Sequence, residues 1–122
     1  MNKYRDKSAP EINKAVAIAL GAYEVATDIF IDKNRRFEFD KPKSQFFFDP
    51  CNNPADAMPI IIENKIAIAF SSNMGKWCAY AWYMMGDHGW DIYERPTICA
   101  FSDSYYRAAM EVFLMMKDAE NE

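Results

Sequence analysis

The sequence predicts an α+β fold in a single domain, residues 1–122, with an N-terminal helix, a short central helix and a long C-terminal helix packed on an antiparallel sheet of about three or four strands. Three observations lead to this prediction. Apolar residues recur at helical spacing near both ends of the chain, and a period-two alternation lies between them. Hydrophobic residues make up 51% of the chain and aromatic residues 16%, which is enough for a packed core.

The first helix is predicted to begin at Ser8, because Ser8 and Glu11 have the spacing of a capping box and Pro10 suits the first turn. Gly21 is a suitable residue just after the helix ends. The apolar face is formed by residues at helical spacing, namely Ile12, Ala15, Val16, Ala19 and Leu20. Residues 22–48 mix β-favouring pieces with charged runs, and the sequence indicates only a short strand or extended segment at 45–48.

The segment Asp49–Ile66 has the densest turn signals, because Asp49 and Asn53 each precede a proline. The central helix is predicted to be capped by Asp56, which places Pro59 in the first turn, where its missing N–H costs no internal hydrogen bond. A start at Pro54 would put Pro59 in the helix interior, at a cost of about 3 kcal/mol. The isoleucine block that follows is expected to fill the core.

The sheet is predicted from residue 66 onward, where Ile66, Ile68 and Phe70 alternate with alanines. A turn at 71–75 leads to a second strand at 76–83. Further strands are predicted at 91–93 and 97–101, after a loop at 86–89.

The last helix is predicted to be capped by Ser102 or Asp103 and to end near Ala119. Its apolar stripe comprises Tyr106, Ala109, Met110, Phe113, Leu114 and Met116. Methionines at 110, 115 and 116 are expected in the core, although a Met-rich face also suits a homodimer.

Three blocks, in order along the chain, carry a family resemblance. They are Glu11–Ala17 with Leu20–Gly21, Asp49–Ile66 (DPCNNPADAMPIIIENKI) and Arg107–Met116 (RAAMEVFLMM). Together these blocks resemble the NinX-like phage protein family, and the middle block is the specific one. The resemblance implies a small protein of tailed phages or prophages that acts in the host bacterial cytoplasm. It implies no particular activity and no catalytic residues.

The residue types needed for catalysis or metal binding are sparse. The cysteines, at 51, 78 and 99, are widely spaced without a CxxC pair, so they are expected to be reduced and mostly buried thiols. His88 is the single histidine, and no base is therefore predicted beside a serine or cysteine nucleophile. We expect a protein that is not an enzyme and uses no metal or cofactor.

Charge and hydropathy limit the partners. Eighteen acidic and fourteen basic residues give a net charge of −4, which argues against binding to a phosphate backbone. No apolar run approaches the ~20 residues of a membrane span, and the N-terminal region resembles an amphipathic helix rather than a signal peptide. We expect no nucleic-acid partner and no membrane association.

The predicted binding residues fall into two groups. The aromatic group is Trp77, Tyr80, Trp82 and Trp90, and the polar group from the middle block is Asp49, Asn52 and Asn53. The aromatic residues have three interpretations: core packing, exposed anchors for a protein partner, or a platform that stacks a nucleobase with Arg35, Arg36 or Lys76 near its phosphates. The leading functional hypothesis is a non-enzymatic accessory protein that binds a host protein. The alternative is a small-ligand or nucleotide-binding protein that sequesters its ligand.

Overall fold

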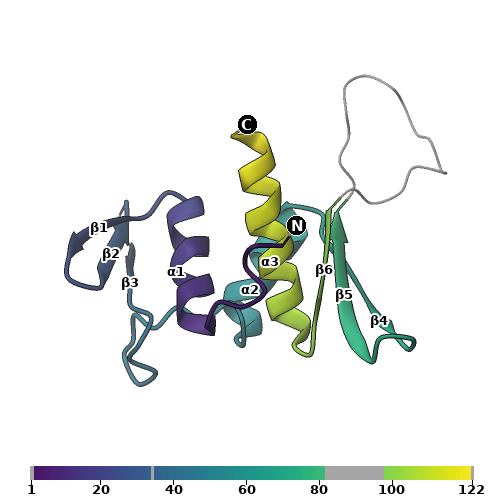
Figure 1. The fold of residues 1–122 in the computed structure, drawn as a ribbon. Helices are drawn as coiled ribbons and strands as arrows, with labels where there is room; N and C mark the ends of the chain where they lie inside the picture. The colour runs from purple at the N-terminus through teal and green to yellow at the C-terminus, as the bar shows by residue number, and fades with distance from the viewer. Residues whose placement is uncertain (1, 34, 82–97, 122) are drawn as a thin grey trace.

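A computed structural model describes residues 2–33, 35–81 and 98–121 (Figure 1). The elements, in order, are α1 (Ala9–Ala19), β1 (Tyr23–Ala26), β2 (Ile29–Asp32), β3 (Arg35–Phe37), α2 (Pro54–Glu63), β4 (Ala67–Ser71), β5 (Lys76–Ala81), β6 (Ile98–Ser102) and α3 (Tyr105–Glu120). The predicted α+β class is confirmed, with three helices and the C-terminal helix packed on a sheet. The loop predicted at 86–89 and the strand predicted at 91–93 lie outside the described residues.

Helix α3 is the centre of the fold. It packs on β5 and β6 on one side and contacts α1 and α2 on the other, and the small sheet β1–β2–β3 lies beyond α1 (Figure 1). Every residue from Ala108 to Leu114 is buried, so this stretch of the helix is enclosed on all sides rather than along one stripe. The buried surface of this helix is therefore wider than the predicted apolar stripe, because the sheet covers one side of the helix and α1 and α2 cover the other.

The antiparallel sheet β4–β5–β6 supports α3 with small residues. Ile68, Ala79 and Ala100 lie opposite one another on neighbouring strands and therefore share a face. Ala79 and Ala100 are buried, as expected for the face that α3 covers. Alanines at these positions let the helix backbone approach the sheet closely, since they leave little side chain between the two layers.

A second sheet, β1–β2–β3, forms in the region whose layout the sequence left open. Its antiparallel ladder pairs Phe30 with Phe37. The segment predicted as a strand at 45–48 contributes only one isolated parallel bridge, between Phe47 and Glu38. A chain of edge-to-face ring contacts then joins this sheet to the following segment, through Phe30, Phe39, Phe48 and Phe37.

Both predicted ends of α1 are confirmed. The Ser8 hydroxyl accepts a hydrogen bond from the Glu11 N–H at 3.3 Å, as a capping box requires. Gly21 has a φ of +113°, and the N–H of Ala22 donates to the carbonyl of Ala17 at 3.0 Å. These features form a Schellman motif, for which glycine is the favoured residue because it adopts positive φ without strain.

The predicted start of the central helix is wrong. Helix α2 begins at Pro54 and is capped by Asn53, whose side-chain oxygen accepts from the Ala55 N–H at 3.0 Å. Asp56 is not the cap, because its carboxylate accepts from the N–H of Asp49 at 3.0 Å. Pro59 therefore lies inside the helix, where it leaves the Ala55 carbonyl without its usual donor. Ala55 is exposed, so water can satisfy that carbonyl and reduce the cost.

Two smaller predictions are also corrected. Helix α3 is capped by Ser104 rather than Ser102 or Asp103, and its hydroxyl accepts from the Arg107 N–H at 3.3 Å. Ser102 is still part of β6, which runs later than predicted. In the isoleucine block, Ile60 and Ile61 are buried but Ile62 is 68% exposed, so only part of the block fills the core. Among the described residues, no helix has both the length and the apolar character needed to cross a membrane.

Candidate functional site

The polar residues predicted from the middle block form a hydrogen-bonded turn. The Asp49 carboxylate accepts from the side-chain amide of Asn13 on α1 at 2.7 Å and from that of Asn52 at 3.2 Å. Asn53 caps α2, and its amide also donates to Asp56 at 3.3 Å. The polar groups of this turn thus hold α1, the turn and α2 together. Ligand contact by Asp49, Asn52 or Asn53 stays a prediction.

Cys51 lies at the centre of this turn and links it to α3. Its N–H donates to the buried Asn13 side chain at 3.1 Å, and its carbonyl accepts from the Ser104 hydroxyl at 3.1 Å. Burial raises the pKa of the Cys51 thiol from 9.0 to about 12. Of the cysteines only Cys51 is buried, since Cys78 is half-buried and Cys99 is exposed, which corrects the prediction of mostly buried thiols.

The three thiols are expected to differ in reactivity with iodoacetamide at about pH 8. Because the thiolate is the nucleophile, Cys99 should react in the folded protein, whereas Cys51 should react only after unfolding in urea. The raised pKa also means that unfolding releases a proton above pH 9.0, so stability should fall as the pH rises from there toward 12. Peptide mass spectrometry measures the labelling. Equal labelling of Cys51 and Cys99 in the folded state would contradict the assignment.

Trp77 belongs to a row of aromatic side chains that runs from β4 to the first turn of α3. Its ring contacts Phe70, the opposite residue on β4, at 5.2 Å between ring centroids, and Tyr105 at 5.1 Å. Tyr105 in turn contacts Tyr106 at 5.0 Å. All three contacts are edge-to-face, the arrangement that aromatic pairs favour. Phe70 is 55% exposed, so the row reaches the surface at β4. We call Phe70, Trp77, Tyr105 and Tyr106 the aromatic row.

Of the other predicted aromatic residues, the structure describes Tyr80. Tyr80 is half-buried on the opposite face of the sheet, where its neighbours across the strands are Ala67 and Cys99. Trp82 and Trp90 lie outside the described residues, as does His88. Trp77 and Tyr80 are both candidate binding residues, and the alternation of side chains along β5 sends them to different faces, as the strand pattern predicts.

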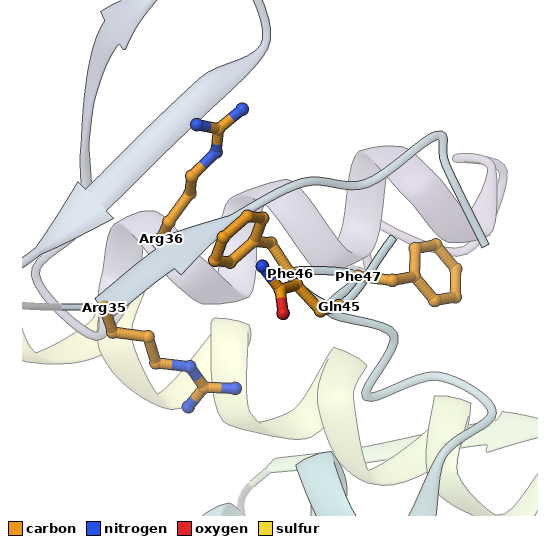
Figure 2. Close-up of a pocket in the computed structure, with 5 residues that line it drawn as sticks. All are labelled: Arg35, Arg36, Gln45, Phe46 and Phe47. Carbon is orange, nitrogen blue, oxygen red and sulfur yellow. The ribbon is translucent and has the colours of Figure 1, made fainter. Parts of the chain in front are cut away.

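A shallow open pocket of about 270 Å³ lies beside β3 (Figure 2). Its lining combines two cationic, one amide and two aromatic side chains: Arg35, Arg36, Gln45, Phe46 and Phe47. The Arg36 guanidinium lies over the Phe46 ring, 4.8 Å from its centroid. The structure therefore brings the predicted Arg35 and Arg36 beside the phenylalanine run at 46–48, while Lys76 lies on β5 in the other sheet.

Two features, one in the pocket lining and one beside it, are absent from the sequence prediction. Gln45 lines the pocket through a turn that no sequence signal marked, and Glu38 is buried although it is charged. The Glu38 carboxylate lies 3.4 Å from Arg36 and 3.6 Å from Lys41, and it accepts from the Ser44 hydroxyl at 3.0 Å. The only sign in the sequence that this carboxylate could be buried is the presence of nearby basic residues that can pair with it. Within the described part of the chain, no group of three or more His, Cys, Asp or Glu side chains is placed to hold a metal ion.

The chain matches a known protein family. The comparison with curated proteins found no match. The family described as Bacteriophage P22, NinX matches the chain over residues 3–117, which includes the region 22–45 that the three sequence blocks did not cover. The resemblance noted from those blocks is thus confirmed over nearly the whole length. The chain belongs to the NinX family of phage proteins.

Proposed function

We propose that this NinX-family protein is a non-enzymatic phage accessory protein that binds a host protein in the bacterial cytoplasm, through the aromatic row. The observation that supports this proposal is the exposure of the row at Phe70, which is 55% accessible next to Trp77 and Tyr105. Tryptophan and tyrosine are the residues most enriched at the energetic centres of protein interfaces. When a partner covers a half-exposed aromatic side chain, apolar surface is removed from water, and this favours binding.

The fold also presents the row rigidly. Trp77 is fixed by β5, Phe70 by the neighbouring strand and Tyr105 by the start of α3, so their rings are held by regular elements rather than by a loop. Ordering these side chains on binding therefore costs little conformational entropy. The net charge of −4 favours a partner whose surface is positively charged around an apolar pocket.

The test is the capture of a host protein, followed by measurement of its affinity in purified form. Phe70→Ala should weaken binding at least about 10-fold, because it removes the exposed end of the row. Tyr23→Ala is the matched control, since Tyr23 is an aromatic residue of β1 with a similar exposure, 58%, far from the row. Biolayer interferometry with the purified partner measures both variants.

Two results would count against this proposal. One is the absence of any reproducible partner from infected cells, and the other is equal affinity of Phe70→Ala and the unaltered chain. The homodimer suggested by the Met-rich last helix stays a prediction, which sedimentation velocity would test. The alternative function, nucleotide binding, has a separate candidate site in the pocket beside β3.

A further inference from the structure

The pocket beside β3 lies in a basic region of an acidic protein. Residues 33–43 contain five basic side chains against two acidic ones, Glu38 and Asp40, which gives a local charge of +3. Since the whole chain carries −4, the remaining residues carry −7. A positive region of this kind attracts anions, although the rest of the molecule is negatively charged and repels them.

The guanidinium groups of this region are held in place but not enclosed. Arg36 is 41% exposed, although it contacts Glu38 and the Phe46 ring. Arg35 points away from Arg36 (Figure 2); it is 58% exposed and lies over Phe37 and Phe48, with the Asp56 carboxylate 3.6 Å away. Glu38 is shared by Arg36 and Lys41, so one carboxylate faces two cations and leaves positive charge at the surface. Arginine is suited to bind phosphate oxygens through its planar fork of donors.

The backbone of β3 adds a donor on the pocket side. Glu38 directs both its N–H and its carbonyl toward the segment 46–48, where they bond to Phe46 and Phe48 at 3.0 and 2.9 Å. Backbone groups alternate in direction along a strand, so Arg36, two residues earlier, directs its N–H to the same side. That side is where Gln45, Phe46 and Phe47 line the pocket (Figure 2).

We propose that this pocket binds a mononucleotide, with its phosphate at the N–H and the guanidinium group of Arg36 and its base against Phe46. Arg36 supplies a cationic group and Phe46 an aromatic ring, which match the two chemically different halves of such a ligand. The volume of about 270 Å³ is near the lower end of small-molecule pockets and suits one nucleotide rather than two. This site is independent of the aromatic row, so either proposal can fail alone.

The experiment is isothermal titration calorimetry of the full chain with inorganic phosphate, adenosine, AMP and a short oligothymidylate. AMP should bind at least about 10-fold more tightly than phosphate or adenosine, since only AMP contacts both sides of the pocket. Arg36→Gln should weaken AMP binding at least about 10-fold. Arg5→Gln is the control, because Arg5 is 74% exposed and its ion pair among the described residues is with its neighbour Asp6.

The outcomes separate the ligand classes. If Arg36→Gln fails to fold, because Glu38 loses a partner, Phe46→Leu provides the second variant with the same expected loss, since it removes the ring that the base contacts. No heat with AMP, or equal AMP affinity of the Arg36 and Arg5 variants, would overturn the proposal. Oligothymidylate binding about 10-fold more tightly than AMP would also overturn it, by assigning the pocket to single-stranded nucleic acid.

Discussion

Replacing Arg107 by methionine is expected to lower the free energy of unfolding by about 3–5 kcal/mol, because it breaks a buried ion pair. The Arg107 Nε atom donates to the Glu111 carboxylate at 2.9 Å, one turn further along α3. The Glu111 side chain is only 2% exposed, so after the substitution its charge would stay buried with the Asn2 amide as its remaining donor. Urea denaturation followed by circular dichroism measures the change.

Arg107 also fixes the N-terminal segment on α3. Its guanidinium donates to the backbone carbonyls of Tyr4, Arg5 and Lys7, which precede α1. The loss of Arg107 should therefore release this segment as well, which faster hydrogen exchange in residues 2–7 would reveal.

The matched control is Lys117→Met on the same helix. Lys117 pairs with Glu120 at 3.3 Å, but both side chains are partly solvent-accessible, at 35% and 55%. An exposed pair of this kind contributes at most about 1 kcal/mol. The double substitution Arg107→Met, Glu111→Met should recover part of the stability, since it leaves no buried charge but still loses the bonds from Arg107 to the N-terminal carbonyls. A small loss in Arg107→Met, similar to that of the control, would show that the buried pair is not strongly stabilising.

The features predicted correctly from the sequence are those that depend on neighbours in the chain. Ser8, Glu11 and Gly21 define the ends of α1 through bonds within a few residues, and these bonds are visible in the order of residue types. The alternation from Ile66 to Phe70 likewise depends only on which face of a strand each side chain takes.

The start of α2 was mispredicted because the deciding contacts are tertiary. Asp56 looks like a cap in sequence, but the Asp49 N–H and the Arg35 guanidinium both use its carboxylate. Asn53 is then the residue with a free oxygen for capping, and the helix starts early enough to include Pro59. Local sequence preferences alone favour the later start, with Asp56 as the cap and Pro59 in the first turn.

The candidate sites were only partly predictable for a related reason. The sequence marks Trp77 as a candidate binding residue, and the alternation of side chains along β5 places it on the opposite face from Tyr80. The contact between Arg36 and Phe46, however, depends on the turn that returns the chain to β3 through the bridge between Glu38 and Phe47. Such a pairing has no periodic pattern, because it consists of a single bridge rather than a strand.

Replacing Phe48 by alanine is expected to cost about 3–5 kcal/mol of stability, the cost of removing a buried aromatic side chain. Phe48 is 1% exposed, and its ring contacts Phe37 at 4.9 Å and Phe39 at 6.4 Å between centroids. It follows the single bridge that joins residues 45–48 to β3, so its burial holds that turn against the small sheet. Urea denaturation measures the loss.

Tyr23→Ala is the control in the same sheet, and its 58% exposure predicts a change below about 0.5 kcal/mol. Phe48→Leu should fold with an intermediate loss, and it then separates stability from binding. Because Phe48 positions the neighbouring Phe46 and Phe47, the folded Phe48→Leu variant should bind AMP more weakly while the affinity for a partner at the aromatic row stays unchanged. Parallel losses at both sites would instead show that the small sheet and the aromatic row are coupled through α3, which lies between them.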